Sequence, residues 1–444
     1  MITTTTEEIF QLKKQIEELK TENAQLKKTN AEVQNEKALP LSISEYSRYG
    51  RQMICDVTNG VKGQLKLKNS KVLFIGAGGL ACPALAYLAG AGVGTIGIVD
   101  DDVVENSNLH RQILHSSAKV GMLKCESARE FLTSLNPHIK IVTHPVRLSN
   151  DNAFEIFAKY DIILDCTDTP ITRYLVSDVA VNLGKMVVSA SGVQTEGQLC
   201  ILNFKNIGPC YRCFYPTPPP PHAVSSCSAG GVIGPCIGLV GVMMAIETMK
   251  IILDVYTIEN FKPFLLQYNG FPEQSLRNFK MRGRQAKCQS CGDTKTIDRT
   301  AIESGKINYF AFCGSKNYNV VSPEERMTVH EFETKYWNNN KKPRDSYVLL
   351  DVRPTHHYEI SHLANTHNIA LKDLQNLKGD MTKLQSKIKS ISETSEVVVM
   401  CRHGNESRTA TRLLKDEFGV ANTKDVIGGF FKYVDEINPQ LPKY

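Results

Sequence analysis

Val72-Leu-Phe-Ile-Gly-Ala-Gly-Gly79 sets an apolar run directly before closely spaced glycines. An apolar run of this length is typical of a buried strand, and glycines that follow a strand let the backbone turn sharply and approach a phosphate group. Asp100 ends the next apolar run, Thr95 to Val99, where a carboxylate can accept both hydroxyls of a ribose. Together these features predict a nucleotide site at the start of a parallel sheet.

Strand and helix patterns alternate through most of the chain. An apolar helix pattern from Leu80 to Ala91 separates the first two strands, and polar, irregular sequence from about Met281 to Lys316 interrupts the alternation. Further strand patterns lie at 161–165, 185–189, 347–351 and 396–400, and the last is followed by a helix pattern from about Ser407. The alternation predicts an α/β fold with a doubly wound, mostly parallel sheet, followed by a smaller α/β block.

The bulk composition is that of an ordinary globular protein with room for two or three domains: 444 residues, 42% hydrophobic and 22% charged. The net charge of +6 is spread out without a long Lys/Arg run, so direct nucleic-acid binding is not indicated. The most apolar stretch, Ile237 to Val255, contains three charged residues, which predicts a buried helix and no membrane span. Thirteen cysteines without an export signal are typical of reduced thiols, and we expect a cytosolic protein.

Residues 7–36 carry a helical heptad pattern. Its apolar positions are Ile9, Leu12, Ile16, Leu19, Leu26 and Val33, with Asn23 and Asn30 at two of the a positions. About four heptads predict a short coiled coil, and asparagine at an a position favours a parallel dimer because a buried amide needs a matching amide. A single solvated helix explains the pattern equally well.

Polar residues that suit a triphosphate follow the strand that ends at Asp100. Ser107-Asn-Leu-His-Arg111 comes first and Lys124 lies on the next helix pattern, and their charges match phosphate groups. Asp168 follows another strand at the edge where ligands bind, and its carboxylate can hold Mg²⁺. An NAD enzyme would share the glycines and Asp100, and each residue alone also fits a surface ion pair, but the ordered set favours ATP.

The residues from about Tyr46 to Gly292 resemble the ubiquitin-activating superfamily, in its molybdopterin-biosynthesis adenylyltransferase branch. The matching segments, in order, are Arg48-Tyr-Gly-Arg51-Gln52, Gly76-Ala-Gly-Gly79-Leu80, Asp100, Ser107-Asn-Leu-His-Arg111-Gln112, Lys124, Asp168, Gly192, Glu196-Gly-Gln198 and Pro209-Cys-Tyr-Arg-Cys213. The resemblance implies that Asp100 holds ribose and that Arg111 and Lys124 hold phosphates. It also implies that Arg51 reaches into the site of a partner in a homodimer. The ATP-binding residues it implies here are Gly79, Asp100, Ser107, Asn108, Leu109, His110, Arg111, Lys124, Asp168, Thr169 and Arg51. Thr169 stands where the family usually has Asn.

Two Cys-x-x-Cys pairs, Cys210/Cys213 and Cys288/Cys291, offer four thiolates for a tetrahedral Zn²⁺ in a closed, structural site. The pairs are far apart in the sequence, so their spacing alone leaves a redox role or a coincidence open. The resemblance supports zinc, one ion per chain, and Gly292 fits the tight turn after the last ligand.

Cys227 lies between Pro216-Thr-Pro-Pro-Pro-Pro221 and Gly230-Gly231, which predicts a loop where the thiol is exposed. A passive loop thiol fits the same residues. The resemblance implies that Cys227 attacks an activated acyl group and forms a thioester.

Cys401-Arg-His-Gly-Asn-Glu406 follows a strand pattern, and Ser407-Arg408 opens a helix. A cysteine in this position meets backbone N–H groups at a helix N-terminus, which favours a thiolate and stabilises a persulfide anion. A tyrosine phosphatase would need Arg at the position of Ser407.

The segment from about Arg326 to Tyr444 resembles a rhodanese domain. Its other landmarks are Leu349-Leu-Asp-Val-Arg353, His362-Leu-Ala-Asn-Thr-His-Asn-Ile369 and Val426-Ile-Gly-Gly429, where Asp351 and Arg353 are expected to buttress the loop.

The combined pattern predicts four segments: an N-terminal coiled-coil-like helix at 1–38, an adenylyltransferase domain at 39–292, a linker at 293–325 and a rhodanese domain at 326–444. The expected fold class is α/β, with a doubly wound Rossmann-like adenylation domain that holds structural zinc, a smaller α/β rhodanese domain and an N-terminal helix.

A chain that joins these two domains resembles the eukaryotic adenylyltransferases and sulfurtransferases that serve molybdopterin synthase and the ubiquitin-related modifier of tRNA thiolation. The resemblance implies ATP with Mg²⁺ as substrate, adenylation of the C-terminal glycine of a small ubiquitin-like sulfur carrier, and sulfur transfer from a Cys401 persulfide to give a thiocarboxylate. It implies a cysteine desulfurase or another sulfur donor. It leaves open the order of Cys227 and Cys401, and whether one or both acceptor proteins are served. Two alternatives remain: an NAD-type oxidoreductase with a passive rhodanese fold, and a scaffold whose adenylation site is inactive.

Overall fold

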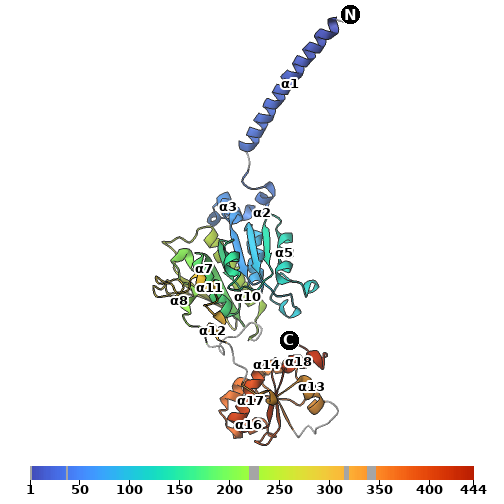
Figure 1. Ribbon diagram of the computed structural model, residues 1–444, viewed down its shortest axis with the longest axis vertical. Helices are drawn as coiled ribbons and strands as arrows, with labels where there is room; N and C mark the ends of the chain where they lie inside the picture. Colours follow the sequence, from blue (N-terminus) through green and yellow to red (C-terminus); the bar gives the residue numbers. More distant parts are fainter. Residues whose placement is uncertain (1–2, 37–38, 220–229, 315–319, 338–346) are drawn as a thin grey trace. The chain divides into compact units, whose positions relative to one another are not determined.

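The computed structural model describes residues 3–36, 39–219, 230–314, 320–337 and 347–444, with the side chains of residues 3–9 and 28–36 left out. The chain divides into two compact units, Met1–Cys313 and Gly314–Tyr444, and each is described by itself (Figure 1).

The first unit is built on one eight-stranded sheet in the order β3-β2-β1-β4-β5-β6-β7-β8. The strands are β1 Lys71–Ile75, β2 Thr95–Val99, β3 Lys140–His144, β4 Ile162–Asp165, β5 Met186–Val193, β6 Glu196–Leu202, β7 Phe264–Asn269 and β8 Ser275–Lys280. Neighbours from β3 to β5 are parallel, and β6, β7 and β8 continue the sheet in antiparallel fashion. The predicted α/β fold with a mostly parallel sheet is confirmed.

Helices cover both faces of this sheet because the buried strands have apolar residues on both sides. In β1, Phe74 belongs to a core cluster that contains Leu85, whereas Leu73 belongs to a second cluster that contains Val176. The helices are α2 Ile43–Met53, α3 Gly60–Asn69, α4 Ala81–Ala91, α5 Lys124–Leu135, α6 Ala153–Phe157, α7 Pro170–Asn182, α8 Tyr211–Phe214 and α10 Gly234–Ile252.

The turn after β1 needs its first glycine. Gly76 has a φ of +96°, a conformation that residues with a side chain rarely adopt, and a Cβ there would lie 3.3 Å from the carbonyl oxygen of Cys166. The tight turn brings the glycine segment to the carboxyl edge of the sheet, where ligands bind in folds of this kind.

Helix α10 is the one helix in the described part of the chain that is long and apolar enough to cross a membrane, by length and composition only. It packs against α4, β5 and β6. Val240 and Met244 lie fully inside the first core cluster, as expected for the helix predicted to be buried.

The first unit extends beyond the predicted boundary at residue 292. Two short helices, α11 Arg299–Glu303 and α12 Tyr309–Cys313, lie within the segment predicted as a linker. Ile302 and Tyr309 belong to the second core cluster, and the Tyr309 hydroxyl donates to Asp178 Oδ2 at 3.0 Å. One-turn helices are too short to show a 3.6-residue period, which explains why the sequence pattern missed them.

The second unit has a five-stranded parallel sheet in the order β11-β10-β12-β13-β9. Its strands are β9 Arg326–Met327, β10 Val348–Asp351, β11 His367–Asn368, β12 Val397–Met400 and β13 Thr423–Val426. Its helices are α13 Val329–Phe332, α14 Thr355–Ile360, α15 Leu371–Asn376, α16 Met381–Lys387, α17 Glu406–Asp416 and α18 Gly429–Glu436, with a π-helix at Glu333–Trp337. A core cluster packs on each face of the sheet, which gives the smaller α/β domain that the sequence predicts.

The N-terminal segment is one continuous helix, α1 Thr3–Glu36. Its predicted seam residues Leu12, Ile16, Leu19 and Leu26 are 50–62% exposed. The helix is therefore confirmed, while its pairing into a coiled coil stays a prediction.

Candidate functional site

A cleft of about 960 Å³ opens at the carboxyl ends of β1, β2, β4 and β5. Seven of the predicted ATP-binding residues line it: Gly79, Asp100, Asn108, Arg111, Lys124, Asp168 and Thr169. They come from separate segments of the chain, and the parallel sheet brings them together because all its strand ends lie on one edge.

Asp100 is fixed beside the glycine turn. Its Oδ2 accepts a hydrogen bond from the backbone N–H of Ala77 at 2.7 Å, and its Oδ1 accepts one from the N–H of Asp102 at 2.9 Å. Burial raises the pKa of Asp100 above its usual range, and the positive charge of Lys124 opposes that shift. Each carboxylate oxygen keeps a lone pair, so the group can accept further bonds from a diol.

Two cations face the cleft from the segment after β2. Lys124 is only 6% exposed, begins α5, and its Nζ lies 2.7 Å from Asp102 Oδ2. Arg111 donates from Nη2 to Asn108 Oδ1 at 2.6 Å. These polar partners hold both charges at the wall of the cleft, where they can bind a polyanion.

The opposite wall is formed by the loop between β4 and α7. Thr169 is the N-cap of α7, with its Oγ1 accepting from the Thr172 N–H at 3.4 Å, and the exposed Asp168 directly precedes it. Arg173 fixes the loop by donating to the carbonyl oxygens of Thr167 and Ala190. Threonine therefore serves this position as a helix cap, and the neighbouring Asp168 is among the residues that line the cleft.

Four predicted ATP-binding residues are not among those that line the cleft: Arg51, Ser107, Leu109 and His110. Arg51 is exposed on α2. His110 Nε2 lies 3.2 Å from Arg111 Nη1, and the Ser107 carbonyl oxygen lies 3.4 Å from the same nitrogen. Both contacts help to hold the Arg111 guanidinium in place. Cys227 lies outside the described residues.

Gln112 is a cleft residue that the sequence-based site set omitted. Its side chain is buried, and within the described residues its Oε1 has no hydrogen-bond partner. A buried acceptor without a donor is costly, and this oxygen atom is itself covered by protein. The sequence did contain a signal for Gln112, because this residue directly follows Arg111 in the motif Ser107-Asn-Leu-His-Arg111-Gln112.

The two Cys-x-x-Cys pairs meet in one cluster. The sulfur atoms of Cys210, Cys213, Cys288 and Cys291 all lie within 4.8 Å of one another, and all four residues are buried. Cys210 Sγ lies 3.5 Å from Cys288 Sγ, and Cys213 Sγ lies 3.3 Å from Cys291 Sγ. Four thiolates about 2.3 Å from a tetrahedral zinc would stand at similar separations, so this cluster could hold a metal ion.

Cys401 follows β12 at the floor of a short loop before α17. Its Sγ lies 3.3 Å from Ser407 Oγ, which in turn donates to Asp425 Oδ2 at 3.1 Å. The side chain is 1% exposed, and burial raises the pKa of the Cys401 thiol. Hydrogen bonds with the Ser407 side chain and with the backbone of Ser407 and His403 act in the opposite direction. We predicted that the loop favours a thiolate; in this conformation burial outweighs the N–H groups.

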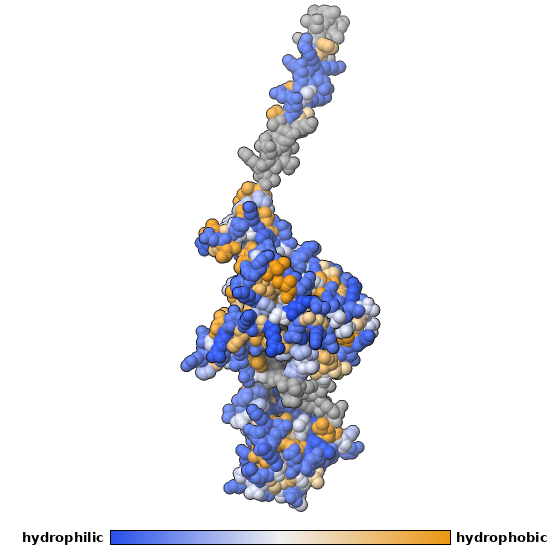
Figure 2. All heavy atoms as spheres, turned by 90° about the vertical axis from the view of Figure 1, so that its left-hand side faces the viewer, coloured by the Kyte–Doolittle hydropathy of each residue, from blue (hydrophilic) through white to orange (hydrophobic). Residues whose placement is uncertain are grey.

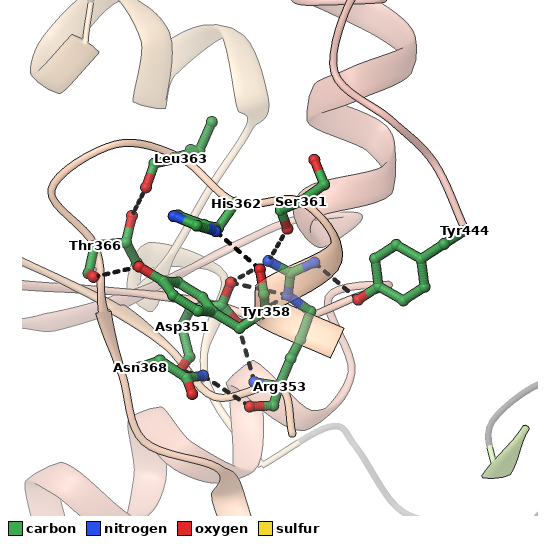
Figure 3. Close-up of polar contacts among 9 residues, drawn as sticks. All are labelled: Asp351, Arg353, Tyr358, Ser361, His362, Leu363, Thr366, Asn368 and Tyr444. Atoms are coloured by element: carbon green, nitrogen blue, oxygen red, sulfur yellow. Dashed lines mark hydrogen bonds and ion pairs between the residues drawn. The ribbon is translucent and has the colours of Figure 1, made fainter. Parts of the chain in front are cut away.

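Arg353 and Asp351 form a buried anchor of the second unit, as Figure 3 shows. Arg353 Nε donates to both carboxylate oxygens of Asp351 at 3.0 and 2.8 Å, and its Nη2 donates to the Ser361 carbonyl at 2.8 Å. Its Nη1 donates to the Tyr444 hydroxyl at 2.8 Å, and Arg402, next to Cys401, packs against the Tyr444 ring at 5.1 Å. The pair thus supports the segment that packs on the cysteine loop.

Residues 49–290 match the model of the ThiF family, and residues 333–436 match that of the rhodanese-like domain. The adenylyltransferase and sulfurtransferase UBA4 of Kluyveromyces lactis is 65% identical over 413 residues, covering 93% of this chain and 92% of the relative. The protein of the same name from Candida glabrata is 66% identical over 407 residues, covering 91% of this chain and 93% of the relative.

A solved structure of E. coli MccB with MccA-N7isoASN is 23% identical to this chain, with a TM-score of 0.49. The match covers 57% of this chain and 76% of that one, and this likeness is too low to carry an argument. The chain therefore belongs to the UBA4 family of adenylyltransferases and sulfurtransferases, in which a ThiF-family unit and a rhodanese-like domain share one polypeptide.

Proposed function

We propose that the chain adenylates the C-terminal glycine of a small ubiquitin-like sulfur-carrier protein and converts it to a thiocarboxylate. The observation that carries this proposal is the cleft where Asp100, Arg111, Lys124 and Asp168 meet, on a chain that also bears the Cys401 loop. A sulfur-transfer domain joined to an adenylating domain fits a product in which sulfur replaces an activated oxygen.

The cleft residues divide the binding of ATP among them. Asp100 would accept the ribose hydroxyls, and Arg111 and Lys124 would neutralise the phosphates. Asp168 would hold Mg²⁺, which supplies further positive charge to the phosphates when bound. Arg51 would act in the site of a second copy, since it does not line the cleft of its own chain.

The first step joins the carboxylate oxygen of the acceptor to the α-phosphorus of ATP and breaks the bond to pyrophosphate. Negative charge moves onto the departing pyrophosphate, and the fixed cations Arg111 and Lys124 are placed to stabilise it. The products are an acyl-adenylate and pyrophosphate, so the step is reversible and is seen as exchange of labelled pyrophosphate into ATP.

In the second step, a terminal persulfide on Cys401, loaded by a cysteine desulfurase, attacks the acyl carbon and AMP leaves. The Cys227 thiolate then attacks the Cys401 sulfur of the acyl disulfide, and the thiocarboxylate leaves. This forms a Cys227–Cys401 disulfide that a cellular thiol must reduce. In the other order, Cys227 first takes the acyl group as a thioester and the persulfide displaces it.

The acceptors would be one or both of the small subunit of molybdopterin synthase and the ubiquitin-related modifier. The chain would then act in molybdenum cofactor biosynthesis, in tRNA 2-thiolation or in both, in the cytosol. The four-cysteine cluster would hold one structural Zn²⁺. Neither direct nucleic-acid binding nor a membrane is part of this proposal.

The test incubates the full chain with a candidate acceptor, MgATP and a persulfide donor, and measures the acceptor by mass spectrometry. We expect one oxygen of the C-terminus to be replaced by sulfur, dependent on both ATP and the donor. An NAD-type oxidoreductase would bind NAD and show no pyrophosphate exchange, and an inactive scaffold would show neither. Either of those results would overturn the proposal.

A further inference from the structure

Helix α1, Thr3–Glu36, carries an apolar stripe that the described part of the chain leaves uncovered. Leu12, Ile16, Leu19 and Leu26 are each at least half exposed, and their spacing of three and four residues puts them on one side of the helix. On the face shown in Figure 2, apolar side chains interrupt the polar surface of α1. A helix of 34 residues is about 51 Å long and gains most of its stability from packing such a stripe.

A groove lies along the same part of the helix. A groove of about 450 Å³ is lined by Ile16, Leu19, Lys20, Asn23, Ala24 and Lys27. In the heptad register these include consecutive a, d, e and a positions, namely Ile16, Leu19, Lys20 and Asn23. In a parallel two-stranded coiled coil, a d side chain of one helix packs into a hole made by those four positions of the other. The groove therefore includes the four residues that would surround the Leu19 side chain of an identical helix.

The charges that flank the stripe select the direction of pairing. In the part of α1 whose side chains are described, the e positions are Lys13, Lys20 and Lys27, and the g positions are Gln15 and Glu22. A parallel pair sets g against e of the next heptad, so Glu22 faces the partner's Lys27 and Gln15 faces the partner's Lys20. An antiparallel pair sets e against e, which brings lysine against lysine.

Asn23 points to the same arrangement. It occupies an a position, and in a parallel, in-register pair it meets its own copy, so the two amides can bond to each other. In an antiparallel pair it would face an apolar d residue and lose its partner on burial. From the groove, the charges and this amide, we propose that α1 pairs with α1 of a second copy of the chain as a parallel, in-register coiled coil.

The test uses the full chain with a single added cysteine on α1. Ile16→Cys places a thiol at the seam, and Thr21→Cys places one at the outer f position as a matched control. After mild oxidation and trypsin digestion, only the disulfide that joins two copies of the α1 peptide is counted, which excludes the native cysteines. We expect a high yield for Ile16→Cys and a low one for Thr21→Cys. Equal yields, or no link at either position, would overturn the pairing.

A charge reversal tests the direction. Glu22→Lys added to Ile16→Cys replaces two attractive pairs by lysine–lysine contacts, so the yield should fall several-fold, and adding Lys27→Glu should restore it. If the double reversal fails to restore the link, the parallel register is wrong. ATP–pyrophosphate exchange should be unchanged in all these variants, because α1 does not line the cleft, and this shows that each variant is folded.

Discussion

At the scale of single residues, Lys124 shows how burial and charge are combined in the cleft. Its ammonium is almost fully buried yet ion-paired with Asp102, whose side chain is 67% exposed. A phosphate group that enters the cleft can take the place of this exposed carboxylate as the partner of the Lys124 ammonium.

We predict that Lys124→Ala or Asp168→Ala abolishes ATP–pyrophosphate exchange while the fold is kept. Loss of one charged contact to a transition state costs roughly 100-fold or more in rate. Lys119→Ala is the matched control, because Lys119 pairs with Glu130 at 2.9 Å and does not line the cleft. Near-normal exchange in the Lys124 and Asp168 variants would contradict the assignment of the cleft.

The second residue-scale prediction concerns the acidity of Cys401. Ser407 Oγ is hydrogen-bonded to the sulfur and lowers the thiol pKa, which burial has raised. Because a raised pKa leaves less thiolate at neutral pH, Ser407→Ala should slow alkylation of Cys401 at pH 7 and move its pH profile further upward. The readout is iodoacetamide labelling of the Cys401 peptide across pH, followed by mass spectrometry.

Ser361→Ala is the control for that experiment. Ser361 is also buried in the second unit, and its Oγ has no hydrogen-bond partner among the described residues. Its replacement should leave the labelling profile unchanged. An unchanged profile for Ser407→Ala as well would show that this hydroxyl does not tune the sulfur.

The type and order of residues in the sequence predicted most of the residues that line the cleft, but not the residues that pair with them. Gly79, Asp100, Arg111 and Lys124 were identifiable because each follows a strand end or begins a helix, and strand ends of a parallel sheet share one edge. Asp102, which pairs with Lys124, could not be found in this way. Its role depends on a side chain 22 residues away, and local patterns do not encode such a distance.

At the scale of elements, the cysteine cluster joins two distant parts of the first unit. Cys210 caps the one-turn helix α8, and Cys288 and Cys291 follow β8. The cluster also packs against Val181 of α7. A bound metal would therefore tie α8 to the segment after the last strand, where short elements contribute little packing of their own.

We predict about one zinc per chain, bound by this cluster, and a clear loss of stability in Cys288→Ser, because structural zinc contributes folding free energy directly. The measurements are metal content of the purified chain and thermal unfolding with and without a chelator. Cys55→Ser is the control, since Cys55 is exposed and lies outside the cluster. Purified chain without zinc, together with normal unfolding of Cys288→Ser, would contradict the assignment.

Element prediction succeeded where runs are apolar and failed where packing is long-range. Strand β2 was predicted with its observed bounds, and β1 was recognised from its apolar run, because their residues pack alternately into the two core clusters. Helix α12 was missed because a long-range contact of Tyr309 holds it in place. The Tyr309 hydroxyl and Arg212 both donate hydrogen bonds to the buried Asp178 carboxylate. A bond across 131 residues leaves no local trace in the sequence.

At the scale of the whole molecule, the chain holds two units with separate cores and separate chemistry. The charged groups that would bind ATP lie in the first unit, and Cys401 lies in the second, together with its Ser407 and Asp425 contacts. A substitution at one centre should therefore leave the other intact, unless the acceptor links them during the reaction.

We predict that Cys401→Ala separates the two activities. Adenylation should survive, because the described residues that line the cleft all belong to the first unit. Sulfur transfer should vanish, because alanine offers no atom to carry the persulfide. Cys227→Ala should spare both exchange and sulfur loading of Cys401 but slow release of the thiocarboxylate. The measurement is a paired assay of both variants: pyrophosphate exchange, and the mass of the acceptor with a protein sulfur donor.

Free sulfide must be excluded from that assay, because it can attack an acyl-adenylate without any protein sulfur. With sulfide absent, thiocarboxylate formed by Cys401→Ala would show that the rhodanese-like domain is not the sulfur carrier. Loss of exchange in the same variant would show instead that the two units are coupled before sulfur transfer. Retained exchange with no thiocarboxylate is the result expected if Cys401 is the atom that hands sulfur to the activated glycine.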